Sequence, residues 1–317
     1  MPEFELPDFS AIEAAAARIA PYATRTPVLC SRTLDALAGA ELHFKCENLQ
    51  RTGAFKFRGA CNAVWSLSDA EAAHGVVTHS SGNHGAALAL AAQTRGIPAH
   101  VVVPEGAVKT KVAAIEAYGA ILHRCAPTMA ARVRRFPRVR AQTGATLVHP
   151  FTDPRVIAGQ GTAVLELVHE SGLLDALVAP IGGGGLVGGS AIAARALSAH
   201  AAVYAAEPAG AADAFESLRL GERVTDLQPD TICDGLRGTI GPINFALLQT
   251  YAIKVLPIED AATIAAMRLL FEHLKIVVEA SAAIALATVL RHADLFAGRR
   301  VGVILSGGNV DLDALPW

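Results

Sequence analysis

The chain has 317 residues, of which 52% are hydrophobic and 18% are charged, and it contains 28 Gly and 16 Pro. This composition excludes a disordered or fibrous protein, and the length predicts about two domains around a core large enough to enclose a pocket. The 27 Lys and Arg residues nearly balance the 29 Asp and Glu residues, which leaves a formal net charge of −2. Nucleic acid is therefore not an expected partner.

The sequence predicts a cytoplasmic protein without a membrane span. The first ten residues carry Glu3, Glu5 and Asp8 and lack the basic and apolar regions of a signal peptide. The uncharged segment 176–194 contains Pro180 and six glycines, which favours a strand, a glycine loop and a helix over a span. The cysteines are widely spaced and odd in number, which predicts reduced thiols; they are Cys30, Cys46, Cys61, Cys125 and Cys233.

Short apolar runs rich in β-branched residues alternate with alanine-rich stretches. The predicted strands and helices, in chain order, are 75–78, 86–95, 100–103, 109–118, 177–181, 186–197 and 301–305. This alternation predicts βαβ units and an α/β fold with parallel sheet. Without repeats or a low-complexity linker, the two domains are expected to interleave, with crossings near 66–72 and in the arginine-rich segment 131–144, which contains Pro137.

Lys56 is the first candidate for chemistry. Thr52 and Gly53 are typical of a helix start, which would place Lys56 in the first turn. There the positive end of the helix dipole and nearby Arg58 disfavour an ammonium and lower the pKa of the lysine. A partly desolvated lysine of this kind forms Schiff bases with carbonyl compounds, including pyridoxal phosphate. Taken alone, Lys56 is better explained as a solvated lysine on a helix; together with turns that suit a phosphate and a carboxylate, the Schiff-base interpretation is favoured.

Three turns rich in glycine and small polar residues follow predicted strands: Ser80–Gly85, Gly182–Leu186 and Ser306–Asn309. Backbone N–H groups at a helix N-terminus bind anions, so the first turn suits a carboxylate and the tetraglycine turn suits a phosphate. Ligands collect at the carboxyl ends of strands in open α/β sheets, so the three turns are expected to share one pocket. Ordinary helix caps and structural turns are the alternative interpretation.

The tetraglycine turn has a second interpretation. Gly183, Gly185 and Gly188 satisfy the GxGxxG pattern, and Glu207 lies 19 residues further on, where a dinucleotide fold has its ribose-binding acid. A nicotinamide-dependent oxidoreductase is therefore a rival hypothesis. No Lys-Ser/Thr pair follows the glycines, which excludes a P-loop.

In order and over nearly the whole chain, Thr52–Ala60, Ser80–Gly85, the tetraglycine turn and Ser306–Asn309 resemble the fold type II pyridoxal-phosphate enzymes. The resemblance is to the branch of serine racemases and serine, threonine or 3-hydroxyaspartate dehydratases. It implies a tryptophan synthase β-like fold of two three-layer α/β domains. Residues 1–69 and 147–317 would form a large cofactor-binding domain, and residues 70–146 a small mobile domain.

The resemblance also implies how the cofactor, pyridoxal 5′-phosphate, is held. Lys56 would bind it covalently, Phe55 would pack beside its ring, Asn83 would bond its 3′-hydroxyl and Ser306 its pyridine nitrogen. The phosphate would rest on Gly182, Gly183, Gly184, Gly185 and Leu186.

For the substrate, the resemblance implies that Lys56 and Ser81 are the catalytic residues, on opposite sides of the cofactor. The substrate-binding residues would be Ser80, Ser81, Gly82, Asn83, His84 and Arg132. Arg132 belongs to five arginines within 132–140, which otherwise form a solvated basic face; paired with a second substrate carboxylate, it would favour 3-hydroxyaspartate. Glu279 departs from the family pattern in its neighbours and receives no role.

Glu207, Ala211 and Asp213 resemble the divalent-cation site of this branch. Two carboxylates and a backbone carbonyl are hard oxygen ligands that suit Mg²⁺, Mn²⁺ or Ca²⁺ in a structural site. Two solvated acids beside a loop are the plain alternative.

The sequence thus predicts β-elimination from a hydroxyamino acid such as serine, threonine or 3-hydroxyaspartate, giving a 2-oxo acid and ammonia, in a homodimer. An amino-acid racemase of the same family is the first alternative. An NAD(P)-dependent oxidoreductase and a cofactor-binding protein without catalysis are the others.

Overall fold

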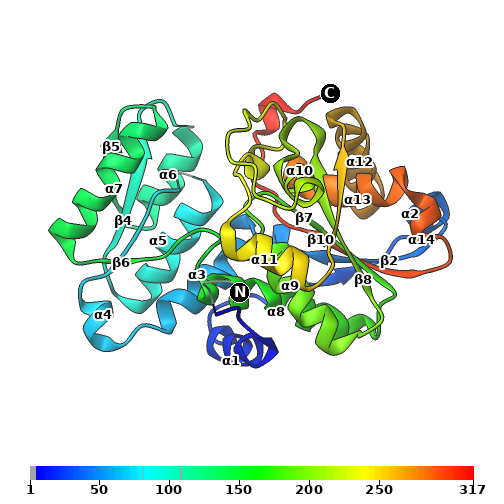
Figure 1. Ribbon diagram of the computed structural model, residues 1–317, viewed down its shortest axis with the longest axis horizontal. Helices are drawn as coiled ribbons and strands as arrows, with labels where there is room; N and C mark the ends of the chain where they lie inside the picture. The colour runs from blue at the N-terminus through cyan, green and yellow to red at the C-terminus, as the bar shows by residue number, and fades with distance from the viewer. Residues whose placement is uncertain (1–4, 81, 108) are drawn as a thin grey trace.

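The computed structural model describes residues 5–80, 82–107 and 109–317, which form two lobes, each with its own sheet (Figure 1). The larger sheet has six strands in the order β1-β2-β10-β7-β8-β9, and only β1 runs antiparallel to its neighbour. Its strands are β1 (Val28–Leu29), β2 (Glu41–Cys46), β7 (Ala176–Pro180), β8 (Ala202–Pro208), β9 (Lys254–Ile258) and β10 (Arg300–Leu305).

The smaller sheet, at the left of Figure 1, has four parallel strands in the order β5-β4-β3-β6. They are β3 (Val76–Thr78), β4 (Ala99–Pro104), β5 (Ile121–Cys125) and β6 (Thr146–Leu147). The predicted α/β class with parallel sheets is confirmed. The expected domain boundaries, at 69/70 and 146/147, stay a prediction.

Helices cover both faces of the larger sheet, because successive apolar side chains along its buried parallel strands point to opposite faces and both faces must be buried. One face packs against α2 (Arg32–Ala38), α12 (Asp260–Leu274), α13 (Ala280–Arg291) and α14 (Ala293–Phe296). The other face packs against α1 (Phe9–Ile19), α8 (Pro154–Ser171), α9 (Gly185–Leu197), α10 (Asp213–Leu220) and α11 (Pro242–Thr250). The short 3₁₀ helices are η1 (Glu47–Leu49), η2 (Arg51–Gly53), η3 (Ala209–Ala211), η4 (Asp234–Leu236) and η5 (Leu312–Ala314).

The smaller lobe is also a three-layer structure. On one face of its sheet lie α5 (Asn83–Arg95) and α6 (Lys109–Ala117), and on the other lies α7 (Met129–Thr143). The remaining helices are α3 (Lys56–Trp65) and α4 (Asp69–Ala73). Apolar residues of α3 pack against both α5 and α8, so α3 joins the two lobes.

Glycines bring α8 into close contact with its neighbours. A Cβ at Gly159 would lie 2.6 Å from the Cα of Gly59 in α3, and a Cβ at Gly189 of α9 would lie 2.3 Å from the carbonyl oxygen of Ile157. The start of α8 is set by Asp153, whose carboxylate accepts a hydrogen bond from the N–H of Arg155, and by Pro154 in the first turn. These contacts determine where α3 and α9, which carry two of the sequence motifs, lie relative to each other.

Two local predictions are wrong. Thr52 and Gly53 do not start a helix: α3 begins at Lys56, and Thr52 lies in η2 with a φ of 60°. The reason is tertiary, because Ala54 bridges to Gly307 and Asn309 contacts this segment. Lys56 nevertheless occupies the first turn, as predicted.

The segment 131–144 is not a crossing between lobes but most of helix α7, despite Pro137 within it. Val139 is buried and Phe136 partly buried against the sheet, while Arg134, Arg138 and Arg140 are exposed, so packing of one apolar stripe stabilises the helix. In the described ranges, no helix combines the length and apolar character that a bilayer span requires.

Candidate active site

A cavity of about 520 Å³ lies between the lobes, a volume that suits a small organic ligand. Residues from both sheets line it, and all three turns that the sequence analysis singled out contribute. The sequence-predicted residues in its walls are Phe55, Lys56, Ser80, Gly82, Asn83, His84, Gly182, Gly183, Gly184, Gly185, Leu186 and Ser306.

Lys56 starts α3, and its Nζ points into this cavity. The ammonium donates a hydrogen bond to the carbonyl oxygen of Pro150 at 3.0 Å and lies 4.9 Å from the centroid of the Phe55 ring. Burial lowers the pKa of Lys56 from 10.5 to about 8, partly opposed by the negative charge of Glu279. A substantial fraction of the amine is therefore neutral near physiological pH, as a nucleophile or general base requires.

A buried cluster of charges anchors α3 beneath this lysine. The guanidinium of Arg58 donates to both carboxylate oxygens of Glu47, at 2.7 and 2.8 Å, and to both of Glu166, each at 2.7 Å. Lys45 also donates to Glu166, at 2.7 Å. Removing one partner from such a pair typically costs about 3–5 kcal/mol, because the remaining charge is left buried and uncompensated. The cluster therefore ties the start of α3 to β2 and α8.

The glycine turn joins β7 to the N-terminus of α9. Gly184 has a φ of 91°, which favours glycine. A Cβ at Gly183 would lie 2.3 Å from Cγ of Phe151, so the ring of Phe151 leaves no room for a larger residue there. The first N–H groups of α9 have no carbonyl partner within the helix, and the dipole there favours an anion. The turn therefore places N–H groups suited to an anion on the cavity wall.

Ser306 follows β10, the strand next to β7. Its side chain is buried, and its Oγ donates to the carbonyl oxygen of Ser281 at 3.3 Å. The backbone of Ser306 accepts a hydrogen bond from the N–H of Phe55 at 2.9 Å. The end of β10 is thus joined directly to the residue that precedes Lys56.

The turn after β3 forms another wall. A Cβ at Gly82 would meet nothing within 4 Å, whereas a Cβ at Gly85 would lie 2.1 Å from the carbonyl oxygen of Ser80. His84 is buried, its Nε2 donates to the carbonyl oxygen of Val148, and its Nδ1 has no hydrogen-bond partner among the described residues. Burial and the nearby charge of Lys56 hold the pKa of His84 well below its ordinary value, so the ring is neutral.

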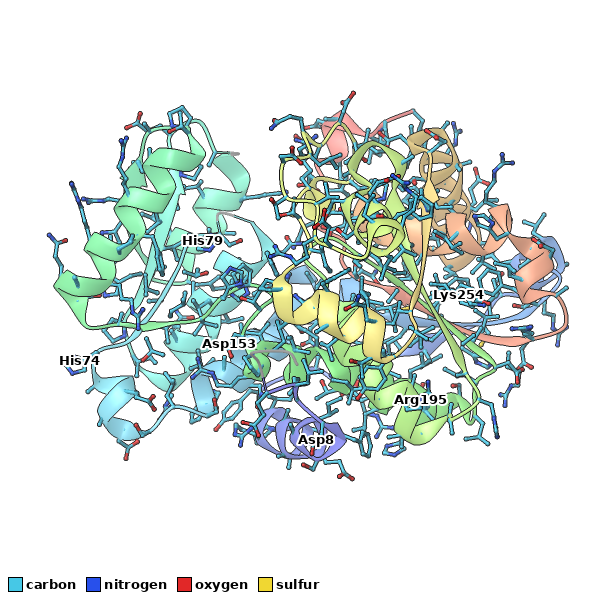
Figure 2. The ribbon with its side chains drawn as sticks, in the orientation of Figure 1. Asp8, His74, His79, Asp153, Arg195 and Lys254 are labelled. Carbon is cyan, nitrogen blue, oxygen red and sulfur yellow. The ribbon has the colours of Figure 1, made fainter. Side chains whose placement is uncertain are left out.

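Two of the predicted site residues lie wholly or partly outside the described part of the chain. Ser81 lies outside the described residues. Arg132 lies in α7, and its side chain likewise lies outside the description, so its distance from the cavity stays a prediction. The position after β3 is described at His79, which is labelled in Figure 2 and also lines the cavity. Its ring contacts those of Phe136 and His149.

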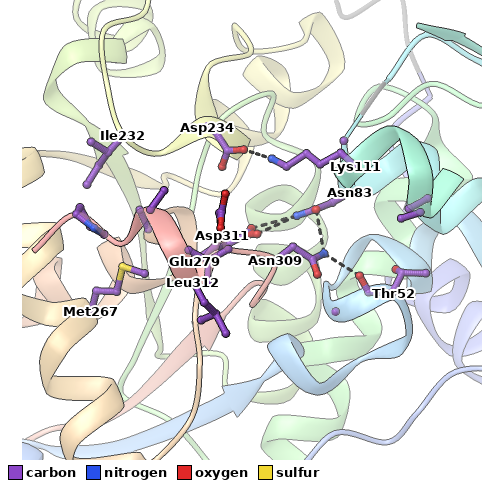
Figure 3. Close-up of a pocket in the computed structure, with 18 of the residues that line it drawn as sticks. Thr52, Asn83, Lys111, Ile232, Asp234, Met267, Glu279, Asn309, Asp311 and Leu312 are labelled. Carbon is purple, nitrogen blue, oxygen red and sulfur yellow. Dashed lines mark hydrogen bonds and ion pairs between the residues drawn. The ribbon is translucent and has the colours of Figure 1, made fainter. Parts of the chain in front are cut away.

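Asn83 connects this cavity to a second one of about 950 Å³. Its Nδ2 donates to both carboxylate oxygens of Glu279, at 3.1 and 3.2 Å, and its Oδ1 accepts from Asn309 at 3.1 Å (Figure 3). Glu279 is buried; burial and the charge of Asp234 raise its pKa to about 7. Asn309 in turn donates to the carbonyl oxygen of Thr52 at 2.7 Å.

Three residues that line the site from opposite lobes were not predicted from the sequence. Glu279 received no role, and Lys111 and Asp234, which form an ion pair between α6 and η4, were not considered (Figure 3). Both cavities are lined by all three. For Glu279 the sequence did hold an indication, because it is a carboxylate in an otherwise apolar helix start. No local sequence feature marks Lys111 or Asp234 as part of the site.

The predicted cation ligands lie together, away from both cavities. Glu207 is the second-last residue of β8, and its carboxylate accepts from the N–H groups of Ala214 and Phe215 at 2.8 and 2.9 Å. Asp213 starts α10 and accepts from the N–H of Ile240 at 2.7 Å. Burial raises the pKa of Glu207 to about 8 and that of Asp213 to about 6. The carboxylate of Glu207 is thus turned into α10 rather than toward a ribose pocket.

Ala211 lies in η3, between these two acids in sequence, and is buried. Its backbone carbonyl and the two carboxylates are all oxygen ligands, a donor set that hard divalent cations prefer. In the part of the chain that the structure describes, no group of three or more His, Cys, Asp or Glu side chains is arranged to hold a metal.

A lysine of lowered pKa and a glycine turn at a helix N-terminus share one cavity between two lobes with mainly parallel sheets, and these are the features of the fold type II pyridoxal-phosphate enzymes. The cavity fits this cofactor, because the glycines leave backbone N–H groups, not side chains, on the wall where a phosphate would bind. Comparison with known proteins leads to the same class of enzyme. The family model described as pyridoxal-phosphate dependent enzyme matches residues 19–307.

Individual relatives are similar over nearly their whole length. The chain is 47% identical to the beta-hydroxyaspartate dehydratase of Paracoccus denitrificans over 312 residues, covering 98% of this chain and 99% of that protein. It is 46% identical to the serine racemase of Arabidopsis thaliana over 313 residues, covering 97% and 95%. The crystal structure of the serine racemase from Dictyostelium discoideum superposes with a TM-score of 0.92 at 45% identity, covering 96% and 99%.

The chain therefore belongs to the pyridoxal-phosphate dependent enzymes, in the branch that contains serine racemases and hydroxyaspartate dehydratases. The predicted family, fold and main cofactor are confirmed, and the nicotinamide interpretation of the glycine turn is wrong. The nicotinamide interpretation needs Glu207 to bind a ribose, but the carboxylate of Glu207 bonds to α10 and does not line the cavity.

Proposed function

We propose that this enzyme catalyses β-elimination from a hydroxyamino acid, giving a 2-oxo acid and ammonia, and that 3-hydroxyaspartate is its preferred substrate class. The observation that carries the proposal is the position of Lys56, with its lowered pKa, in one cavity with the glycine turn and Ser306. The hydroxyaspartate preference rests on the 47% identity to a beta-hydroxyaspartate dehydratase.

The residues of the cavity fit the cofactor. Lys56 would hold it covalently and Phe55 would lie beside its ring. Asn83 would bond the 3′-hydroxyl of the ring and Ser306 the pyridine nitrogen. The phosphate would be bound by the N–H groups of Gly182, Gly183, Gly184, Gly185 and Leu186. When bound, the cofactor supplies an aldehyde for the substrate amine and a ring that stabilises negative charge at the α-carbon.

The remaining chemistry is assigned to the chain itself. The N–H groups of the turn Ser80–Gly85 would bind the α-carboxylate of the substrate. The neutral Nζ of Lys56 would accept the α-proton as general base. The β-hydroxyl would then leave as water, with the proton supplied by the phosphate group of the cofactor when it is bound, and hydrolysis of the resulting enamine yields the 2-oxo acid and ammonia. Closure of the smaller lobe over the cavity would exclude bulk water during these steps.

The second carboxylate of a hydroxyaspartate needs a cation on the small-lobe side of the cavity. We assign this role to Arg132, in helix α7. A guanidinium pairs bidentately with a carboxylate, which would distinguish hydroxyaspartate from serine and threonine.

Racemisation is the second candidate function. It is favoured by the 46% identity to a serine racemase and by a serine, Ser81, at the sequence position that resembles the second acid/base of that branch. The two functions share every other residue named above, and product analysis distinguishes them.

Three further features belong to the proposal. Glu207, Asp213 and the carbonyl of Ala211 would hold a structural Mg²⁺, Mn²⁺ or Ca²⁺ ion. The protein would act as a cytoplasmic homodimer, in keeping with five unpaired cysteines.

The test uses purified protein and a substrate panel of L-serine, L-threonine and the four 3-hydroxyaspartate isomers. We expect a yellow protein, 2-oxo acid and ammonia from at least one hydroxyaspartate isomer, and cofactor fixed to Lys56 by borohydride. Lys56→Ala should lower kcat at least about 10³-fold, because it loses both the attachment point and the general base. Lys254→Ala, at an exposed lysine in β9, is the control. Undiminished turnover by Lys56→Ala, or no 2-oxo acid from any substrate, would contradict the proposal.

A further inference from the structure

A second cluster of reactive side chains lies at the outer edge of the larger sheet. β1 pairs with β2 so that Leu29 faces Phe44, and this antiparallel register brings the next residue, Cys30, beside His43. Side chains two apart in a strand share a face, so Glu41 lies on the same side as His43. The register thus aligns a thiol, an imidazole and a carboxylate.

The hydrogen bonds of this cluster determine the tautomer of the histidine. The Nε2 of His43 lies 2.9 Å from Oε1 of Glu41, and a carboxylate accepts only if that nitrogen carries the hydrogen. The other nitrogen, Nδ1, then has a free lone pair directed at the sulfur of Cys30, 3.6 Å away. This is the arrangement of a nucleophile, a general base and an orienting carboxylate.

Accessibility separates Cys30 from the other cysteines. Cys30 is exposed, whereas Cys46, Cys61, Cys125 and Cys233 are buried. His43 is only 7% exposed, so its ring is fixed in place. Cys30 lines neither cavity, and a reagent must approach it from solvent.

We propose that Cys30, His43 and Glu41 form a thiol-modification site that exchanges with small disulfides of the glutathione type. The thiol proton passes to Nδ1 of His43, and the sulfur of Cys30 attacks one sulfur of the disulfide. A new S–S bond forms, the old one breaks, and the departing thiolate takes the proton back from the imidazolium. Glu41 stabilises the transient imidazolium. The step consumes one disulfide and releases one thiol, so atoms and electrons balance.

The surroundings explain why a base is needed. Burial and the carboxylates of Asp35 and Glu41 raise the pKa of the Cys30 thiol, with a smaller opposing effect of Arg300. The thiol is therefore protonated at neutral pH. Arg300 is itself held by the carboxylate of Glu41, at 3.3 Å, and Glu170 of α8 accepts from the N–H of Val28 nearby. His43 is the neighbouring group that can accept the thiol proton.

The experiment treats native protein with oxidised glutathione between pH 6 and 9 and follows labelling by intact mass and peptide mapping. We expect one label, on Cys30, and a rate at pH 7 at least tenfold lower in His43→Gln. Because a thiolate needs no base, the ratio of the two rates should fall steadily as the pH rises toward the raised pKa of the thiol. Glu41→Gln should show a smaller loss, and His200→Gln, at an exposed histidine, none.

Circular dichroism confirms that each variant is folded, and Cys30→Ser should remove the label. Three results would overturn the proposal: equal rates at pH 7 in wild type and a folded His43→Gln, labelling of a buried cysteine instead, or no label on Cys30 until the protein is unfolded.

Discussion

At the scale of single residues, burial brings two groups of opposite charge type toward neutrality in one cavity. It lowers the pKa of Lys56 to about 8 and raises that of Glu279 to about 7. The carboxylate of Glu279 opposes the effect on Lys56, because a nearby negative charge favours the ammonium. Glu279 thereby influences how much of the lysine is available as a neutral amine.

Glu279→Gln tests this coupling. In wild-type apo protein, the rate of pyridoxal phosphate uptake, followed by absorbance, should rise with pH around a midpoint near 8, because only the neutral amine reacts. The glutamine keeps an oxygen for Asn83 but removes the charge, so the midpoint should move to lower pH. Glu272→Gln, at an exposed position of α12, should leave it unchanged. An unchanged or higher midpoint in Glu279→Gln would show that the two groups are not coupled.

At the scale of elements, the junction of β8, η3 and α10 buries two acids. Both have raised pKa values, with burial as the main cause. Because the pKa of Glu207 rises from 4.5 unfolded to about 8 folded, the fold without a cation is favoured below pH 4.5 and loses stability as pH rises toward 8. A bound cation would reverse this loss, since it stabilises the ionised acids.

Thermal unfolding with and without chelator measures this effect. Mg²⁺ at a hundredfold excess over its Kd should stabilise the fold by about 2.7 kcal/mol. The difference in Tm between Mg²⁺ and chelator should grow from pH 6 to pH 8, as protons leave Glu207. Glu207→Gln should show no such difference. If Mg²⁺, Mn²⁺ and Ca²⁺ all leave the wild-type Tm unchanged at pH 8, the junction does not bind a divalent cation.

At the scale of the whole molecule, the site exists only where two lobes meet. Lys111 of α6 in the smaller lobe pairs with Asp234 of η4 in the larger lobe, and Asn83 bonds to Glu279 across the same boundary (Figure 3). These polar contacts hold the lobes together over the cavity. Lys111 and Asp234 are both partly exposed, so their pairing weakens with salt.

Lys111→Met should therefore raise KM for the substrate several-fold while changing kcat less, because it weakens closure without touching Lys56. The reversed pair Lys111→Asp with Asp234→Lys should recover part of the loss. The control is Arg124→Met, which removes an exposed ion pair with Glu116 inside the smaller lobe. Steady-state kinetics at low and high salt provide the measurement. A KM equal to that of wild type would mean that the pair does not contribute to closure.

Much of the fold was predictable from local patterns. Alternating strands and helices and their glycine turns follow from side-chain periodicity and backbone preference, which act within a few residues. Lys56 and the glycine turn were therefore identified from sequence. The irregular backbone at Thr52 was not, because it follows from contacts with the segment after β10. Likewise, helix α7 persists through Pro137 because its apolar side packs against a sheet.

The sequence by itself predicted the class of fold, which is confirmed, because the periodicity of strands and helices depends on neighbours along the chain. It also marked Lys56 and the glycine-rich turns as candidates, whereas the lowered pKa of Lys56 comes from burial in the folded protein. Only the tertiary structure decided that Glu279 faces Asn83, 196 residues away, and that Lys111 meets Asp234, 123 residues away. It also decided that Cys30 and His43 form a pair. The physical reason is that charge, burial and proton transfer depend on distance in space, and no short-range pattern records which distant segments will share a boundary.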